Sequence, residues 1–295
     1  MTLISIITPS FNQADYLSDL IISIKKQSYR PIEHIIVDGG SSDGTVDLLH
    51  AYCKNPCGIN VSWLSEKDRG QAHAVNKGFA LARGEVIGWI NSDDVYFHTG
   101  VFERVVKEFA RHPEVDVIHA NVAKISKNNL IGLIWCIPDF CYERMFVDGK
   151  VSQPTVFFRR KVMENNKLLE NLLCLDYEYW LRIGRKFTFM HINDVFAGDR
   201  DQPDRISRTR TQELLESHKV TLQRYNFQVS PIRHAWYSIT SIPQRGMLRG
   251  IGLFTLLRFF FNRKKLAFDA RFDNLSIMIR RQLFSRIGTL FNEND

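Results

Sequence analysis

The sequence predicts an α/β fold, a mostly parallel sheet flanked by helices, with a basic helical C-terminal appendage. Short β-branched runs alternate with helical patterns through the first 120 residues, an order that requires crossover connections between parallel strands. The run 86–90 (VIGWI) is apolar without alternation, as expected of a strand buried on both faces. With 295 residues, the chain has room for one large domain of this class and an appendage.

Strands and helices are predicted in alternation along the chain. The predicted strands are residues 3–8, 34–37, 61–64, 86–90 and 115–119. The predicted helices are residues 14–27, 46–54, 72–82 and 101–112. In the first helix, Leu17, Leu20 and Ile24 fall on one face, and Ser10 or Asn12 is placed to cap the first turn.

A composition boundary near residue 226 divides the chain into two regions. Residues 226–295 carry 11 Lys and Arg against four Asp and Glu, together with nine of the 21 Phe residues. Residues 1–225 are formally neutral. We therefore predict an α/β domain over 1–225 and a basic, Phe-rich helical region over 226–295.

The C-terminal region is predicted to act at a surface. Residues 251–261 are apolar and residues 262–265 (NRKK) follow directly, which fits an amphipathic helix on an anionic membrane surface. A helix packed on the first domain is the alternative. No signal-peptide pattern is visible, no apolar run approaches the ~20 residues that span a bilayer, and the five Cys lack paired metal spacing. We expect a cytoplasmic protein, with peripheral association at the inner face of the cell membrane.

The most informative stretch is the end of the strand 86–90, where Asp93 and Asp94 follow an apolar run. Two carboxylates beside a buried strand cost free energy unless a cation offsets them, and an open α/β sheet binds ligands at this edge. A divalent cation holding a diphosphate explains both features, whereas the alternative is a polar loop whose carboxylates cap the next helix. The loops 38–45 and 65–70 add glycine and polar residues at the same edge, although each alone is typical of a simple turn.

Several stretches in order resemble family 2 inverting glycosyltransferases, which have the GT-A (Rossmann-like) fold. Residues 8–17, 27–49 and 65–96 resemble the nucleotide-binding half, and residues 152–160 and 175–182 resemble the acceptor-side motifs. The resemblance implies a metal-dependent enzyme that transfers a sugar from a nucleotide-diphosphate sugar to an acceptor hydroxyl. It also implies a glycan or lipid-linked acceptor of the kind used in surface-polysaccharide biosynthesis.

The resemblance implies roles for residues around the DxD-type motif. Asp94 is the implied ligand of Mn²⁺ or Mg²⁺, and Asp93 the implied partner of the ribose or of a metal-bound water. Ser92 stands where a strict motif has its first Asp, so the diphosphate and water would supply most of the metal's ligands. The residues implied to line the nucleoside and sugar are Thr8, Asn12, Asp38, Asp68, Arg69 and Gly70.

The sequence specifies the nucleobase of the donor sugar nucleotide less closely. Many members of the family carry a second Asp where this chain has Gly39. A UDP-sugar is the first expectation, and GDP- and dTDP-sugars stay open. On the acceptor side the implied residues are Gln153 and Arg200. Arg200 stands where many relatives place a His near the diphosphate, and His73 is a further candidate for a phosphate contact.

Asp176 and Glu178 are the two candidates for the catalytic base. On a helix they point about 200° apart, so only one faces the cleft. Trp180 and Ile183 continue an apolar stripe from Asp176, and the resemblance also implies Asp176 as the general base. The alternative is that Asp176 caps the helix. Glu178 is expected at the surface or paired with Arg182.

Two other classes of function are weighed against a glycosyltransferase. A nucleotidyltransferase would bring an N-terminal Gly-rich loop with Lys or Arg, which residues 9–12 (PSFN) do not offer. A non-catalytic module that binds nucleic acid or membranes would use the basic C-terminal region, but the neutral residues 1–225 argue against nucleic acid. The transferase is favoured because metal carboxylates and a candidate base occur together in order.

Overall fold

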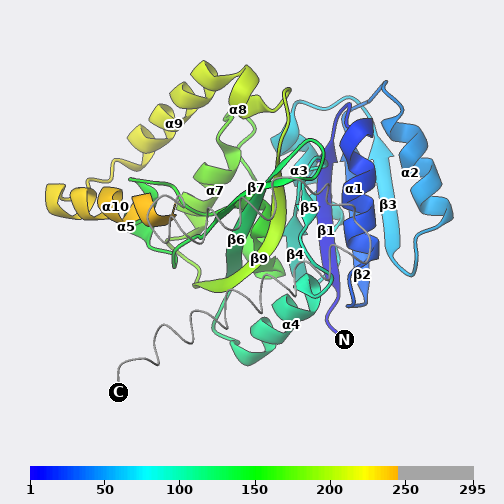
Figure 1. Ribbon diagram of the computed structural model, residues 1–295, viewed down its shortest axis with the longest axis horizontal. Helices are drawn as coiled ribbons and strands as arrows, with labels where there is room; N and C mark the ends of the chain where they lie inside the picture. The colour runs from blue at the N-terminus through cyan, green and yellow to red at the C-terminus, as the bar shows by residue number, and fades with distance from the viewer. Residues whose placement is uncertain (245–295) are drawn as a thin grey trace.

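The computed structural model describes residues 1–244 and shows an α/β fold built on one nine-stranded sheet (Figure 1). The strands are β1 Ile4–Ser10, β2 Ile32–Asp38, β3 Asn60–Ser65, β4 Val86–Trp89, β5 Val95–Tyr96, β6 Val117–Ser126, β7 Ile131–Trp135, β8 Phe157–Arg159 and β9 Phe189–Asp201. The helices are α1 Ala14–Lys25, α2 Thr45–Lys54, α3 Gln71–Leu81, α4 Val101–Arg111, α5 Tyr142–Met145, the 3₁₀ turn η1 Gln153–Thr155, α6 Arg160–Met163, α7 Leu175–Ile183, α8 Ile206–Thr209, α9 Thr211–Tyr225 and α10 Pro231–Gln244. The predicted fold class is confirmed.

The sheet is parallel in its first half and mixed in its second. Its strand order is β3-β2-β1-β4-β8-β6-β9-β5, with β7 paired to β6. β1 to β4 pair in parallel, whereas β8 lies antiparallel to both of its neighbours, β4 and β6. Two antiparallel steps restore the original direction, so β6 and β9 run the same way as β1 to β4. The predicted fifth strand is therefore present, but β8 separates it from β4.

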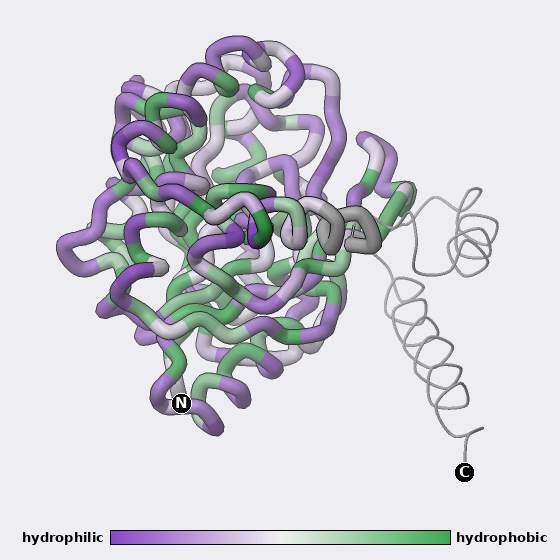
Figure 2. Tube along the Cα trace, turned by 90° about the vertical axis from the view of Figure 1, so that its left-hand side faces the viewer, coloured by the Kyte–Doolittle hydropathy of each residue, from purple (hydrophilic) through white to green (hydrophobic). Residues whose placement is uncertain are grey.

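Helices cover both faces of the sheet and enclose two apolar cores. The helices α1, α2 and α4 pack on one face, and α3, α6 and α7 pack on the other. In α4 the buried apolar residues recur at helical spacing: Val101, Phe102, Val105 and Phe109. α3 packs so closely that a Cβ at Gly78 would lie 2.4 Å from Ile7 Cγ2. Figure 2 shows hydrophobic segments running through the middle of the molecule and hydrophilic ones at the turns.

The loop after β1 is locked by the loop after β2. Ser10 and Asn12 do not cap α1, because the N-cap residue is Gln13 and its side chain makes no capping bond. Instead, the Ala14 N–H donates to Asp43 Oδ2 at 2.9 Å. Asn12, at φ 51°, accepts from the Ser42 N–H at 2.9 Å. The predicted cap was wrong because the Asp43 carboxylate, from the neighbouring loop, accepts the hydrogen bond from the first N–H of the helix.

The chain returns across the carboxyl edge of the sheet after β9. α8 and α9 lie along this edge, and α9 ends at Tyr225, followed by Asn226 in the left-handed conformation, with φ 40°. α10 then begins at Pro231. The composition boundary near residue 226 thus coincides with a helix end, while the predicted amphipathic segment 251–265 lies outside the described residues. Within residues 1–244, no helix is long and apolar enough to cross a membrane.

Candidate active site

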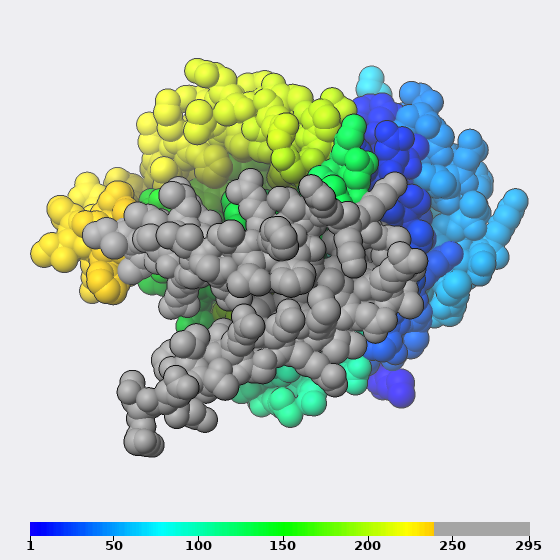
Figure 3. Space-filling view, in the orientation of Figure 1, coloured from blue at the N-terminus to red at the C-terminus, as the bar shows by residue number. Residues whose placement is uncertain are grey.

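A cavity of about 1030 Å³ opens at the carboxyl ends of the parallel strands. Its walls come from the loops after β1, β2, β3 and β4, from the first turn of α7, and from α8 and α9. The sheet topology explains this convergence, because parallel strands present all their carboxyl-end loops at one edge. In Figure 3 the segment containing α8 and α9 forms the upper edge of the molecule, beside the N-terminal half.

Asp93 and Asp94 lie in this cavity directly after β4. The Asp94 side chain is buried, and its Oδ1 accepts a hydrogen bond from the Arg200 N–H at 3.0 Å. Burial, together with the charges of Asp93 and Asp199, holds the pKa of Asp94 well above its usual range. Burial also raises the pKa of Asp93. A cation placed here would offset this repulsion.

The described residues hold no group of three or more His, Cys, Asp or Glu arranged to bind a metal ion. Asp94 and Asp93 fit a hard divalent cation in their chemistry, because carboxylate oxygens are its preferred ligands. Most of the remaining ligands would have to come from a bound diphosphate and water.

Arg200 contributes to the cavity lining beside these carboxylates, although its side chain is fully buried. Its side chain is 0% exposed and donates to Asp93 O at 2.6 Å, Lys127 O at 3.0 Å and Asp19 Oδ2 at 3.0 Å. Each of these hydrogen bonds of the guanidinium goes to the protein, and the contact of Arg200 with an acceptor or diphosphate stays a prediction. Arg200 fixes the loop that carries Asp93.

Arg205, which the sequence did not single out, occupies the accessible position. Its side chain is 28% exposed and lines the cavity, with Nη1 3.1 Å from Asp199 Oδ1. Burial lowers its pKa, but the carboxylates of Asp199, Asp94 and Asp93 outweigh this effect and raise it. No local motif marks Arg205, because its relation to Asp93 and Asp94 depends on the return of the chain after β9.

The predicted nucleoside residues divide into those that line the cavity and those that support its wall. Asp68 and Gly70 line it. Thr8 is buried with its Oγ1 3.1 Å from His34 Nε2, and the Asp38 carboxylate accepts from the Ser41 N–H and the Ser65 hydroxyl.

Three further residues from the sequence analysis also lie outside the cavity lining. Asn12 holds the loop after β2, as described above, and does not line the cavity. The Arg69 side chain is 68% exposed and pairs with Glu170 at 2.7 Å. His73 contacts the Arg69 N–H through Nδ1 at 3.2 Å. These residues shape the wall without lining it.

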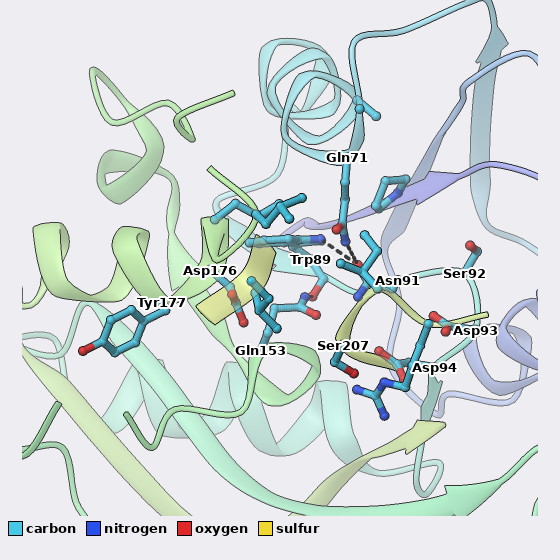
Figure 4. A pocket seen from close by; sticks show the side chains of 18 of the residues that line it. Gln71, Trp89, Asn91, Ser92, Asp93, Asp94, Gln153, Asp176, Tyr177 and Ser207 are labelled. Atoms are coloured by element: carbon cyan, nitrogen blue, oxygen red, sulfur yellow. Dashed lines mark hydrogen bonds between the residues drawn. The ribbon is translucent and has the colours of Figure 1, made fainter. Parts of the chain in front are cut away.

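The strand end and α3 are joined through one amide. Asn91 Oδ1 accepts from Gln71 Nε2 at 2.6 Å and from Trp89 Nε1 at 3.3 Å (Figure 4). Gln153 donates to Trp89 O at 2.6 Å, which places it between Asp176 and Asp94 in the same view. Gln153 lines the cavity, with Nε2 hydrogen-bonded to the end of β4, and its acceptor-side role stays a prediction.

Asp176 lies in the first turn of α7 and faces the cavity, and burial raises its pKa. Trp180 and Ile183 are fully buried, so the predicted apolar stripe is confirmed. Glu178 points elsewhere: it is 1% exposed, pairs with Arg182 at 3.0 Å and accepts from the hydroxyl of Tyr225 at 2.7 Å. The predicted pairing is confirmed, whereas the surface placement of Glu178 was wrong because α9 covers it.

α9 adds a wall that the sequence analysis did not anticipate. Leu214, His218 and Leu222, spaced four residues apart, line the cavity opposite the strand ends. The centroid of the His218 ring lies 4.8 Å from that of the Tyr177 ring. The proximity of His218 to Asp176 offsets part of the rise that burial causes in the pKa of that carboxyl. The four-residue spacing of these side chains predicts that they share one face of a helix. It does not distinguish a face that lines a cavity from one that packs on the core.

Comparison with known proteins places these motifs in a family. The family model described as "Glycosyl transferase family 2" matches residues 5–181. A putative teichuronic acid biosynthesis glycosyltransferase, TuaG of Bacillus subtilis, is 44% identical over 92 residues, which is 31% of this chain and 36% of that protein. The uncharacterized glycosyltransferase EpsJ of Bacillus subtilis is 25% identical over 247 residues, 82% of this chain and 64% of that protein. The chain thus spans about a third of the length of TuaG and under two thirds of EpsJ.

Solved structures share the fold at low sequence identity. TarS of S. aureus, residues 1–349 in complex with UDP-GlcNAc, superposes with a TM-score of 0.61 at 17% identity, over 87% of this chain and 76% of that one. The mannosyltransferase PcManGT from Pyrobaculum calidifontis, in complex with GDP-Man and Mn²⁺, gives a TM-score of 0.59 at 16% identity, over 99% of this chain and 88% of that one. At such identity the likeness concerns the fold alone.

Proposed function

This chain belongs to glycosyl transferase family 2, and from that membership we propose that it transfers a sugar from a nucleotide-diphosphate sugar to an acceptor hydroxyl with inversion at the anomeric carbon. One observation carries the proposal: Asp94 and Asp176 line the same cavity from different walls. Asp94 belongs to the strand ends that suit a nucleotide, and Asp176 to the helix beyond them. A reaction that releases a diphosphate and deprotonates a hydroxyl needs both groups.

Asp94 would hold Mn²⁺ or Mg²⁺, with Asp93 at a metal-bound water or the ribose. The metal, when bound, would act as a Lewis acid on the leaving diphosphate. The raised pKa values of both carboxyls support this role, because a cation would favour the ionised forms that burial and the neighbouring carboxylates disfavour. Arg205 adds a permanent positive charge on the same wall.

Asp176 would act as the general base that removes the proton from the acceptor hydroxyl. Its raised pKa makes it a stronger base than an exposed carboxylate, provided that the pH keeps it ionised. The two structural neighbours bind UDP-GlcNAc and GDP-Man, so they support a nucleotide sugar as donor but do not distinguish uracil from guanine as its nucleobase. We propose a UDP-sugar as the first donor to test, with GDP- and dTDP-sugars as alternatives.

The acceptor would be a glycan or lipid-linked glycan at the inner face of the cell membrane. α10 supports this part of the proposal, because Ile232 and Trp236, one helical turn apart, are 84% and 63% exposed. The sequence after α10 carries the basic, Phe-rich composition noted above. Full-length protein should sediment with anionic vesicles and less with neutral ones, and Ile232→Ser with Trp236→Ser should weaken sedimentation. Equal sedimentation with both lipids would remove the membrane from the proposal.

Calorimetry of the full chain with UDP, GDP and dTDP, each with Mn²⁺ and with EDTA, tests the central proposal. At least one nucleotide should bind, and more tightly with Mn²⁺. The anomeric configuration of the transferred sugar, read by NMR, tests inversion. Absence of binding by all three nucleotides under both conditions would contradict the proposed function.

A further inference from the structure

A second cavity of about 530 Å³ adjoins the first. Asp94, Gln153, Asp176 and Arg205 line both cavities, so these side chains form the boundary between them. The second cavity contains none of the nucleotide-side loops after β1, β2 and β3. Its remaining walls come from β6, from the end of β7 and from the segment 148–154.

The shared boundary assigns the second cavity to the acceptor. If the donor occupies the first cavity, as proposed above, an attacking hydroxyl must reach Asp176 from outside the space that the nucleotide fills. The second cavity reaches Asp176 and Asp94 together without passing the nucleotide-side loops. Its volume falls within the range of small-molecule sites.

Trp135 is the main apolar surface of this cavity. It ends β7, is 37% exposed and lines the cavity wall. Lys124, on the paired strand β6, places its Nζ 4.2 Å from the centroid of the Trp135 ring, an arrangement that steadies the indole through a cation–π contact. A partly exposed aromatic face beside hydrogen-bonding groups matches a pyranose ring, which has C–H groups on its faces and hydroxyls on its rim.

The cationic side chains of the cavity are already paired with carboxylates that line it. Lys124 and Arg205 both pair with Asp199, and Lys150 lies 3.5 Å from Asp148. An anionic acceptor would have to compete with these carboxylates and with Asp94 and Asp176 for each cation. A neutral sugar, by contrast, has hydroxyls that can donate to the carboxylate and accept from the cation of each pair, so the paired charges need not separate.

We propose, on the basis of the proposed function, that the second cavity is the acceptor site and that it holds an uncharged pyranose against Trp135. Trp135 is then a specificity-determining residue rather than a catalytic one. Its loss should weaken sugar binding and raise the KM for acceptor, while nucleotide binding in the first cavity stays intact.

Saturation-transfer NMR of the full chain with methyl β-glycosides of glucose, galactose, N-acetylglucosamine and glucuronic acid tests the site. We expect millimolar binding of at least one neutral glycoside and at least threefold weaker binding of the glucuronide. Trp135→Ala should lower the affinity for the neutral sugar about tenfold and Trp135→Phe only a few-fold. Leu81→Ala, at an exposed apolar residue of α3 outside both cavities, is the control and should change nothing.

A second measurement uses the unaltered protein. Cys136 lines the second cavity beside Trp135, whereas Cys53 is an exposed residue of α2 outside both cavities. The bound glycoside should slow the alkylation of Cys136 by iodoacetamide and leave that of Cys53 unchanged. The proposal is overturned if no neutral glycoside binds, if the glucuronide binds as well, if Trp135→Ala binds like the wild type, or if Cys136 is not protected. Failure of UDP, GDP and dTDP to bind the wild type would instead count against the proposed function.

Discussion

The two halves of the sheet hold their carboxylates in opposite ways. At the end of β2 and in the loop that follows, carboxylates are satisfied by nearby donors: Asp38 accepts from the Ser41 N–H, and Asp43 accepts from the N–H groups of Ala14 and Thr45. These bonds outweigh burial and lower the pKa of Asp43. Around β4 and α7 the reverse holds, because burial raises the pKa of Asp94 and of Asp176.

This contrast separates carboxylates that stabilise loops from carboxylates that are kept for chemistry. A carboxylate with several N–H donors is stabilised as an anion and has little left to offer a ligand. A buried carboxylate with few donors favours a cation or a proton, which is what a metal ligand or a general base must do. The same distinction explains why Asp38 supports the wall while Asp94 lines the cavity.

The largest expected effect comes from removing the proposed base. Asp176→Asn should keep the fold and nucleotide binding but lower kcat about 10²–10⁴-fold, because an amide cannot accept the proton. Steady-state kinetics with the identified donor would measure this. Glu178→Gln is the matched control on the same helix and should change kcat far less. A reversed ranking of the two variants would contradict the assignment of helix faces.

The pH profile of the wild type sharpens the same test. The raised pKa of Asp176 means that the base is protonated at low pH and ionised above its pKa. Activity should therefore rise with pH through an acidic limb and then level off. That limb should lie at higher pH than the ordinary range of an Asp carboxyl, and it should be absent from the residual activity of Asp176→Asn.

The next largest effect concerns the metal. Asp94→Asn should abolish the gain in nucleotide affinity that Mn²⁺ provides, with a loss of roughly 10–100-fold. Calorimetry with Mn²⁺ and with EDTA measures this, and Asp43→Asn serves as a control carboxylate from the other half. An unchanged response to Mn²⁺ in Asp94→Asn would show that the ion binds elsewhere.

Asp43→Ala tests the opposite side of the comparison. Loss of the bonds to Ala14 and Thr45 should lower the free energy of unfolding by about 1–2 kcal/mol, as for other helix-capping side chains. The value of kcat at saturating donor should be unchanged. Urea unfolding at pH 7 together with kinetics would detect the split, and a large fall in kcat without a loss of stability would contradict it.

A pair of buried histidines gives a second test of stability, in which two residues of the same type are compared. His34 contacts Thr8 Oγ1 at 3.1 Å and the hydroxyl of Tyr52 at 3.2 Å, whereas both ring nitrogens of His119 lack a hydrogen-bond partner within the described part of the chain. His34→Phe should therefore cost about 1–3 kcal/mol, because two buried hydroxyls lose their partner. His119→Phe should change stability by less than about 1 kcal/mol. Urea unfolding at pH 7 compares the two, and equal losses would refute the distinction.

The same histidines predict acid sensitivity. Burial lowers the pKa of each to about 3 from an ordinary value of 6.5. The folded state therefore excludes a proton that the unfolded chain binds. The contribution of the two neutral rings to the free energy of unfolding should be fully present above pH 6.5 and should be lost as the pH falls toward 3. His119→Phe should flatten this decline, whereas an unchanged slope would show that His119 is protonated without cost.

Local pattern predicted the first half of the molecule well, because its contacts are close in sequence. Strands and helices up to α4 follow from periodicity, and their loops must meet at one edge since the strands are parallel. The same reasoning found the carboxylates of Asp93 and Asp94. It did not find β8, a three-residue strand placed between β4 and β6, because so short a run carries no periodic signal.

The sequence by itself determined the α/β class, the family and the residues that carry its motifs. Only the tertiary structure decided which charged groups are accessible: Arg200 is fully buried by contacts up to 181 residues away in sequence, while the Arg205 side chain is 28% exposed at the cavity wall. It also decided that α9 covers Glu178 and faces Asp176 with His218. Burial and pairing depend on contacts between segments that are distant in the sequence. The type and spacing of a residue do not specify which distant segment packs against it.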